Sequence, residues 1–305
     1  MPKNPFSRGG RYGAVVPVQG KTFFVSSNAA TLADLQNRFP VDEDGVTLCH
    51  STLAAAIAES SASSGASRGD VVYALPGHAE TFTTALALSV AGISVLGLGN
   101  GNLRPVLTGN GAIDAVNITA ANVLFENFLF AAPETDNQTA DINVAAAGVT
   151  IRNIRIIGSQ TSKNVVDCIT IASGANDLTI ENVRMYNSVV AVNSFISIEA
   201  AVARLEMRDI MCFGDVVAGG LIDAAAATQI FMENVRIAVV GTTKPAATLD
   251  SNPTGMARNC FFSGTSTTLA DNGALGNAMR VDNIKVLEET DNSKSAAIIP
   301  AVDTD

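Results

Sequence analysis

The sequence predicts an all-β protein, a parallel β-helix in which each coil contributes three short strands and about nine coils stack into a rod. Two observations predict this fold. One is a motif that recurs seven times at a nearly constant period, and the other is a composition with 47% hydrophobic residues, 16% charged residues and no Trp. Small and β-branched side chains repeated at equivalent inward positions suit the narrow core of stacked coils.

The repeated motif is an alternating apolar segment interrupted by a charged residue followed by Asn or Asp. Its copies lie at 123–130 (VLFENFLF), 149–156 (VTIRNIRI), 178–185, 205–212 and 230–237, with degenerate copies at 258–262 and 281–286. The spacings between the seven Asn or Asp residues are 26, 29, 27, 25, 25 and 24. Because apolar positions alternate on both sides of this residue, each copy predicts two short strands joined at a corner.

We predict that the Asn or Asp forms the corner, since Asn tolerates the left-handed conformation better than most residues. These corner residues are Asn127, Asn153, Asn182, Asp209, Asn234, Asn259 and Asn283. Stacked at equivalent corners, their side chains are expected to form an internal amide ladder. A third strand precedes each copy, as at 168–171 and 195–198, so one period makes one coil. Segments 71–75 and 93–98 predict earlier coils.

The open ends of such a stack need covers, because a bare terminal coil exposes core and an unpaired strand edge. Residues 51–60 begin with Ser and Thr and carry apolar residues at Leu53, Ala56 and Ile57, which predicts a short amphipathic capping helix. A second helix is expected at 28–39. We therefore divide the chain into an N-terminal arm and cap region (1–50), the β-helix (51–286) and an acidic C-terminal tail (287–305).

Net charge is unevenly distributed along the chain. Residues 1–22 contain Lys3, Arg8, Arg11 and Lys21 and no acidic residue, so they carry +4, whereas the remaining 283 residues carry −14. A basic segment of this kind docks on an acidic protein surface or on nucleic acid, or is simply an unstructured end. Pro2, Pro5 and the Gly9-Gly10 pair favour an extended arm, and we expect its four basic residues to bind a partner.

Charged residues beside the corners form a second pattern. Acidic and basic residues precede the corner residue in turn, and they are expected to line up along one ridge: Glu126, Arg152, Glu181, Arg208, Glu233 and Arg258. This ridge binds a partner, or it is a solvated corner whose neighbouring charges neutralise each other. We favour the solvated corner.

Residues 69–80 (GDVVYALPGHAE) lead from the predicted capping helix into a strand and a Pro-Gly turn, and residues 90–100 (VAGISVLGLGN) follow. In these segments the chain resembles the pectin-lyase-like right-handed β-helix proteins over about residues 50–286, and it looks most like those of tailed bacteriophages. The resemblance implies a right-handed coil. It implies no single function, because this scaffold hosts polysaccharide lyases, hydrolases, tailspikes and capsid decoration proteins.

The motifs contain no pattern typical of catalysis. Sugar-cleaving β-helices need clustered carboxylates and aromatic platforms, whereas this sequence has no Trp, three Tyr and no paired acids in the repeats. Asp167, Asp215 and Asp223 are the candidate constellation, and we expect no catalytic role for them. The four Cys lack metal-ligand spacing and are predicted to be buried free thiols. We therefore expect no enzyme, no cofactor and no metal site.

The expected function is that of a bacteriophage virion structural protein. No apolar run is long enough to span a membrane and no secretory signal is present, so we expect assembly onto the virion in the bacterial cytoplasm, without membrane or nucleic-acid partners. The first hypothesis is a capsid decoration (cement) protein that binds the major capsid protein and stabilises the head by mass action. A homotrimer is implied by the resemblance. The alternatives are a tail fibre or tailspike component that binds or cleaves bacterial surface polysaccharide, and a free polysaccharide lyase.

Overall fold

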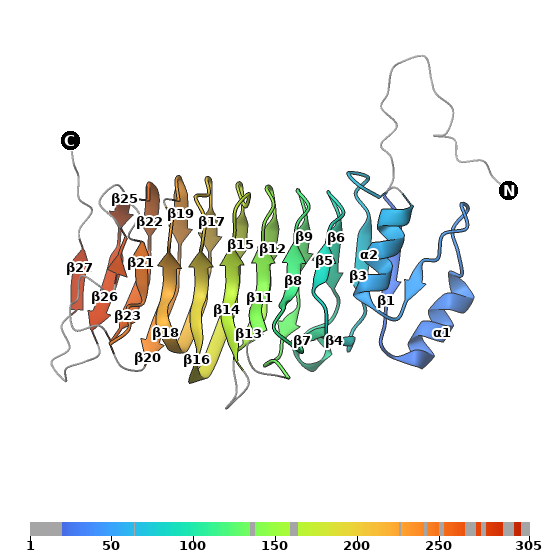
Figure 1. Ribbon diagram of the computed structural model, residues 1–305, viewed down its shortest axis with the longest axis horizontal. Helices are drawn as coiled ribbons and strands as arrows, with labels where there is room; N and C mark the ends of the chain where they lie inside the picture. Colours follow the sequence, from blue (N-terminus) through green and yellow to red (C-terminus); the bar gives the residue numbers. More distant parts are fainter. Residues whose placement is uncertain are drawn as a thin grey trace, which may run out of the picture.

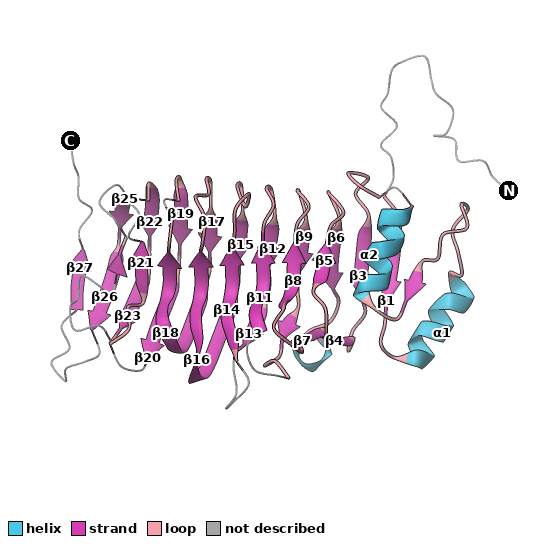
Figure 2. Ribbon diagram, viewed as in Figure 1, coloured by secondary structure: helices cyan, strands magenta, loops and turns pink. Residues whose placement is uncertain are grey.

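The computed structural model describes residues 20–63, 65–134, 138–158, 164–225, 227–240, 243–249, 253–265, 273–275, 279–288 and 296–299. This part of the chain is a stack of β-coils with two helices at its N-terminal end (Figure 1). Strands account for nearly all of the regular structure (Figure 2).

Equivalent strands of successive coils pair into three ladders, which we name A, B and C. Ladder A contains β1 (Thr22–Val25), β2 (Cys49–His50), β3 (Val71–Ala74), β6 (Ser94–Gly97), β9 (Leu124–Glu126), β12 (Thr150–Arg152), β15 (Thr179–Glu181), β17 (Glu206–Arg208), β19 (Ile230–Glu233), β22 (Gly255–Arg258) and β25 (Met279–Asp282). Ladder B contains β4 (Ala79–Phe82), β7 (Val106–Gly109), β10 (Leu129–Phe130), β13 (Arg155–Ile157), the first halves of β16 (Arg184–Ile198) and β18 (Met211–Asp223), β20 (Arg236–Val240), β23 (Phe261–Gly264) and β26 (Ile284–Glu288). Ladder C contains β5 (Leu86–Leu88), β8 (Asp114–Ile118), β11 (Gln138–Val144), β14 (Val165–Ile171), the second halves of β16 and β18, β21 (Ala247–Leu249) and β24 (Gly273–Ala274).

One coil runs through ladders A, B and C in that order, and a short 3-10 turn (Gly101–Leu103) precedes β7. Ladder A contains nine strands from β3 to β25, one for each of nine coils in the described residues. Each of these strands pairs in parallel with its equivalent in the next coil. The predicted parallel β-helix is therefore confirmed. In two coils the ladder B and C strands are continuous, as β16 and β18, so the corner between them is a bend within a strand.

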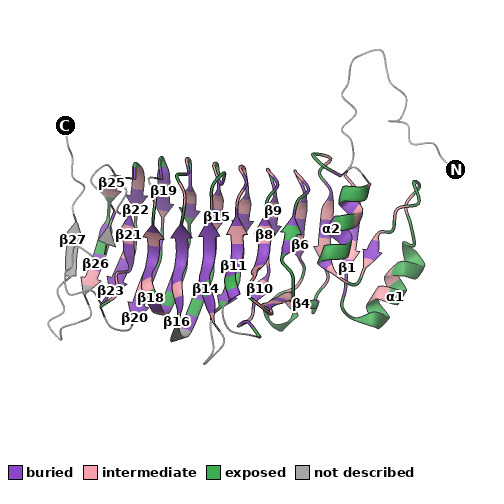
Figure 3. Cartoon of the chain, viewed as in Figure 1, coloured by how far each residue is buried: buried purple, intermediate pink, exposed green. Residues whose placement is uncertain are grey.

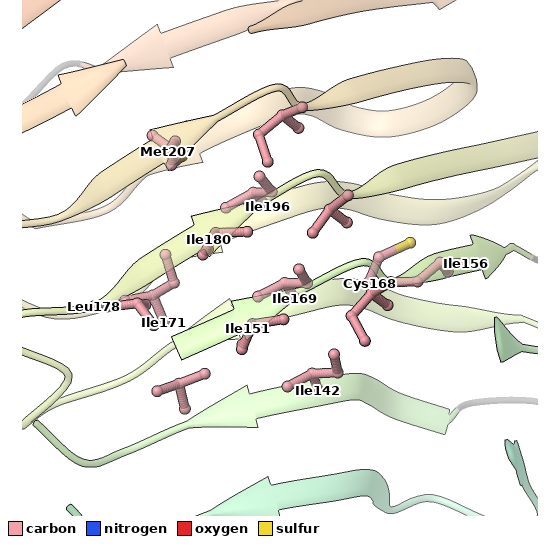
Figure 4. Close-up of a cluster of buried hydrophobic side chains, with 14 of the residues drawn as sticks. Ile142, Ile151, Ile156, Cys168, Ile169, Ile171, Leu178, Ile180, Ile196 and Met207 are labelled. Atoms are coloured by element: carbon pink, nitrogen blue, oxygen red, sulfur yellow. The ribbon is translucent and has the colours of Figure 1, made fainter. Parts of the chain in front are cut away.

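The core is a set of columns of like side chains running along the stack. Ile142, Ile169 and Ile196 occupy one register position of ladder C in successive coils (Figure 4). Ile151, Ile180 and Met207 occupy the equivalent position of ladder A. All six side chains are completely buried. Period-two alternation in each short strand thus places one apolar residue above the next, as the motif predicts.

Two helices lie at the N-terminal end of the stack. Helix α2 (Leu53–Ala62) buries Leu53, Ala56 and Ile57, and the Thr52 hydroxyl accepts a hydrogen bond from Ala55 N–H, so the predicted capping helix is confirmed. The second helix, expected at 28–39, is α1 (Ala29–Arg38); Asn28 caps it, and it buries none of its residues (Figure 3). It contacts the stack through Gln36, whose Nε2 donates to Cys49 O at 3.3 Å, and through its C-cap residue Phe39, whose ring stacks on Phe24.

Both boundary regions contribute strands to the stack. Strand β1 lies within the predicted arm and cap region and pairs with β3 over four residues. The stack of β-coils therefore already begins at residue 22. At the other end, β27 (Ala296–Ile299) pairs antiparallel with β26, inside the predicted tail. The ladder B edge of the last described coil is thus paired with a strand of the same chain.

Candidate functional site

All seven predicted corner residues have a positive φ, between 50° and 66°. The backbone N–H of the corner donates to a carbonyl of the following coil, as from Asn182 to Arg208 O at 3.0 Å. Three neighbouring pairs also join through their side chains. Asn182 Nδ2 donates to Asn153 Oδ1 at 2.7 Å, Asn234 to Asp209 at 3.0 Å, and Asn283 to Asn259 at 2.8 Å. The corner residues are therefore a structural device that fixes the turn in each coil.

This ladder differs from the expected internal one in its position. Asn182, Asn234 and Asn283 are exposed, and Asn127 and Asn153 are half-buried. The inward position at each corner belongs to the next residue, such as Ile154 or Val183, which is buried and apolar. The amide groups therefore lie at the surface and the core remains apolar.

The charged ridge beside the corners lines up in register as predicted. Arg152 pairs in the ladder with Glu126 and Glu181, and Glu233 pairs with Arg208 and Arg258. Ion pairs follow this order: Arg152 to Glu126 at 2.8 Å and Arg258 to Glu233 at 2.6 Å. Since opposite charges alternate and partly neutralise each other, the geometry fits a solvated corner.

Of the four basic residues assigned to the arm, Lys21 is described, and Lys3, Arg8 and Arg11 lie outside the described residues. Lys21 is held within the chain, because its Nζ lies 2.5 Å from Asp42 and 2.9 Å from Asp44, and its side chain is only 12% exposed. Burial lowers its pKa, but the hydrogen bonds and charges of the two carboxylates outweigh this and raise it. Lys21 therefore anchors the start of the described chain to the cap region instead of presenting a free charge to a partner.

A buried carboxylate next to Lys21 ties the cap region together. Asp70 is fully buried, and it accepts hydrogen bonds from Arg68 at 2.8 and 2.7 Å, from the Ser60 hydroxyl at 2.6 Å and from Lys21 N–H at 2.7 Å. Burial raises the pKa of Asp70, but these hydrogen bonds and the Arg68 charge hold it below its ordinary value. The cluster joins β1, the end of α2 and the start of β3.

His78, in the Pro-Gly-His turn, has a structural role at the capped end of the stack. Its buried ring accepts a hydrogen bond at Nδ1 from Ser27 N–H at 3.0 Å, and its Nε2 lies 3.1 Å from Glu80 Oε2. The same Glu80 oxygen accepts from Leu53 N–H at 2.8 Å, at the first turn of α2. One ring nitrogen thus holds the segment that follows β1, and the other lies against Glu80, which joins the first coil to the capping helix.

The three aspartates considered as a catalytic constellation do not meet. Asp167 pairs in the ladder with Ser194, and Ser194 pairs with Gly219. Gly219 lies four residues from Asp223 along β18, about 13 Å in an extended strand. Asp215 lies in the ladder B half of β18, on the other side of the bend, where it pairs with Val240. Asp167 instead accepts hydrogen bonds from Ser194 Oγ at 2.5 Å and Asn193 Nδ2 at 3.2 Å. Among the described residues, no group of three His, Cys, Asp or Glu is placed to hold a metal ion.

One carboxyl group lies inside the stack. Asp141 is 2% exposed, in a column of ladder C next to Cys168, and it accepts a hydrogen bond from Gln138 Nε2 at 2.7 Å. Burial raises its pKa to about 8, although the bond from Gln138 opposes the shift. The four Cys are free and buried, as predicted, and burial raises the pKa of each thiol.

The outer surface of ladder B carries a feature that the sequence interpretation missed. The second residue after each corner points outward there, and in register these residues are Leu129, Arg155, Arg184, Met211, Arg236, Phe261 and Lys285. The recurring Arg in VTIRNIRI, LTIENVRM and IFMENVRI was the available signal. The recurring Arg predicts a surface feature only when the face of the coil on which it lies is known.

These residues line a groove that we name the basic groove. One part, of about 760 Å³, is lined by Arg104, Arg155, Arg184 and Tyr186, among others. A second part, of about 550 Å³, is lined by Arg236, Phe261 and Lys285, among others. Met211 and Phe213 line both parts, so the groove continues along the stack. No Asp or Glu is present among the described residues that line either part.

Comparison with known proteins gives a fold relationship. The chain is similar to the crystal structure of pectate lyase Pel9A, with a TM-score of 0.55 and 13% sequence identity over 87% of this chain and 68% of the lyase. It is also matched to ORF18 of Geobacillus virus E2, at 10% identity over 89% and 78% of the two chains, but the TM-score of 0.30 carries no argument. No protein-family model and no curated protein matches the sequence. The first match supports a pectin-lyase-like parallel β-helix and, at this identity, establishes the fold alone.

This match corrects the expectation that the chain is not an enzyme. That expectation depended on the missing Trp and on the lack of paired acids in the repeats, yet the solved structure with the same fold is a lyase. A β-helix of this kind is thus compatible with catalysis, and the repeat composition does not decide the question.

Among the described helices, neither is long and apolar enough to cross a membrane.

Proposed function

We propose that the protein is a structural component of a tailed-bacteriophage virion, and that it decorates the capsid by binding the major capsid protein through its N-terminal arm. The observation that supports this most is the arrangement at the capped end of the stack. Three basic residues, Lys3, Arg8 and Arg11, precede Lys21, whose ion pairs fix the chain to the cap region. A basic segment joined to a rigid rod at a fixed point suits attachment to an acidic lattice surface.

In this proposal the rod assembles as a homotrimer on the head, in the bacterial cytoplasm. A ligand that binds only the assembled lattice stabilises it by mass action, so the rods strengthen the head as they occupy it. The regular stack supports such a role because its core is continuous from β3 to β26 and β27 pairs with the ladder B edge of the last described coil.

Deletion of residues 1–19 tests the arm. We expect the truncated protein to remain folded but to lose cosedimentation with capsids assembled from the major capsid protein of the same phage. Replacing Lys3, Arg8 and Arg11 together by Gln should have the same effect. Lys21→Gln is the matched control, because it removes the same charge from an internal ion pair and should lower stability without abolishing attachment. Attachment retained by the truncated protein contradicts the proposal.

The basic groove supports a second candidate function, that of a tail fibre or tailspike component that binds a bacterial surface polysaccharide. Cations next to exposed aromatic rings suit an acidic sugar polymer better than they suit a purely structural surface. The two functions are separated by which part of the chain each one needs, the arm or the groove.

A further inference from the structure

The geometry points to an acidic polysaccharide as the ligand of the basic groove, bound along ladder B with its carboxylates on Arg155 and Arg184 and its sugar faces on Tyr186 and Phe213. This inference depends on the second candidate function and names its site and its ligand class. It is independent of the arm, so each proposal can fail alone.

The first argument is a concentration of unpaired like charges. Arg155 and Arg184 lie opposite each other in adjacent strands, whose backbones are about 4.8 Å apart. Arg104 lines the same part of the groove. None of the three forms an ion pair with a described residue. Burial, and then the charges of Arg155 and Arg184, lower the pKa of Arg104, and its Nε is buried with no hydrogen-bond partner in the described part of the chain. An anion in the groove would relieve this repulsion.

Arginines elsewhere on the rod are arranged differently. Arg152, Arg204 and Arg258 also reach the surface, with side chains 42%, 55% and 42% exposed, but each has a carboxylate partner, namely Glu126, Asp177 and Glu233. The protein carries a net charge of −10, so acidic partners are plentiful on its surface. Their absence from the described lining of the groove leaves a local positive potential on an acidic molecule, which is how a charged ligand is concentrated at one place.

The second argument is an aromatic platform beside these cations. Tyr186 and Phe213 lie in register on adjacent coils, with ring centroids 5.9 Å apart and planes only 11° from parallel. Their side chains are 52% and 46% exposed, and Ile157 and Met211 beside them are also exposed. A contiguous apolar patch of this kind marks a binding surface, and flat exposed rings offer a face for the C–H groups of sugar rings.

The shape and charge of the groove favour a sugar polymer over other occupants. Beyond Arg184 the cations continue on every second coil, at Arg236 and Lys285, which suits a long ligand better than a small anion. A second copy of the chain joined two-fold through this face would set one basic surface against another, with no Asp or Glu in the described lining of either to pair with it. Nucleic acid needs a broadly basic domain, whereas this chain is acidic overall.

Equilibrium binding of the full-length protein to three immobilised polymers tests the inference. Polygalacturonate supplies sugars with carboxylates, dextran supplies sugars without charge, and poly-L-glutamate supplies carboxylates without sugars. We expect binding to polygalacturonate that weakens with salt, and at least about tenfold weaker binding to dextran and to poly-L-glutamate. The double variant Arg155→Gln/Arg184→Gln should lose at least about tenfold in affinity for polygalacturonate.

Two further variants separate charge from stacking. Tyr186→Ala/Phe213→Ala should weaken binding to polygalacturonate about tenfold or more and leave the weak binding to poly-L-glutamate unchanged. Arg204→Gln, which removes a paired arginine outside the groove, is the matched control and should bind as the parent does. All four exchanged positions of the double variants are exposed, so the variants should fold, and circular dichroism checks this. Arg155→Lys/Arg184→Lys keeps the charges and provides a milder second test.

Three results would overturn the inference. One is the absence of polygalacturonate binding by the folded parent protein. Another is equally tight binding of poly-L-glutamate that the aromatic variants do not affect, because this would assign the groove to an acidic protein. The last is an equal loss of affinity in Arg204→Gln, which would place the binding outside the groove. Deletion of residues 1–19 should leave polygalacturonate binding intact, so a failure of the arm proposal is distinguishable.

Discussion

Replacement of Asp70 by Asn should destabilise the capped end of the rod. The variant keeps the shape of the side chain but removes the charge that Arg68 and Lys21 N–H contact. Arg68 is left 11% exposed without the carboxylate that contacts it directly, and the new amide group faces the donors of Arg68, Ser60 and Lys21. Breaking a buried pair by removing one partner costs about 3–5 kcal/mol, and we expect about 3 kcal/mol because Arg68 keeps some contact with water.

The pH dependence of this effect has a defined sign. Asp70 has a lowered pKa in the folded protein, so its contribution is complete above the ordinary carboxyl pKa of about 4 and is lost as the pH falls through the lower folded value. The difference in unfolding free energy between parent and variant should therefore be constant from about pH 5 to 8 and shrink in more acidic solution.

Urea unfolding followed by circular dichroism measures the difference, and amide hydrogen exchange locates it. Faster exchange is expected first in α2, β1 and β3, the three elements that contact Asp70 and Arg68. Asp34→Asn is the matched control, because Asp34 pairs with Arg38 on exposed α1 and should cost at most about 0.5 kcal/mol. A loss below about 1 kcal/mol for Asp70→Asn, or one that does not shrink in acid, would refute the reasoning.

Two further predictions concern the interior and the corners. Asp141 has a pKa raised to about 8, so the folded state binds one more proton than the unfolded state between about pH 4 and 8, and parent stability should fall across this window. Asp141→Asn should therefore gain stability over the parent as the pH rises, by several kcal/mol at pH 9, and a difference independent of pH would contradict this. Asn182→Ala should cost about 1–2 kcal/mol in urea unfolding, since its φ is 50° and its bond to Asn153 is lost. Asn182→Gly tolerates that φ and should cost less, so equal losses for Ala and Gly would count against the corner role.

The fold was predictable because the same two-strand motif repeats along the chain at a nearly fixed period. Alternation on both sides of Asn153 or Asn182 predicts two strands and a corner, and the positive φ of these residues shows that the corner has that conformation. Strand β1 was less visible, since residues 22–25 carry no motif and join the stack only by pairing with β3. The continuous strand β16 was also hidden, because a bend within a strand leaves no turn residue as a signal.

The basic groove could be predicted only in part. Arg155 and Arg184 share one motif position, but Arg104 lies outside the motif, and Tyr186 and Phe213 come from coils whose sequences differ at that position. The sequence contains few aromatic residues, and this low content by itself argues against sugar binding. Stacking the coils brings two of those few rings side by side on the surface, and no count along the chain contains that information.

The central claim is that this rod is a component of a phage particle, attached to the head by its N-terminal arm. Electron cryomicroscopy of intact particles, with the protein located by its β-helical density, tests it most directly. The account predicts rods on the outer surface of the head, with the segment preceding Gly20 in contact with the major capsid protein. Rods found at the tail and none on the head would contradict the capsid assignment and favour the polysaccharide-binding function of the groove.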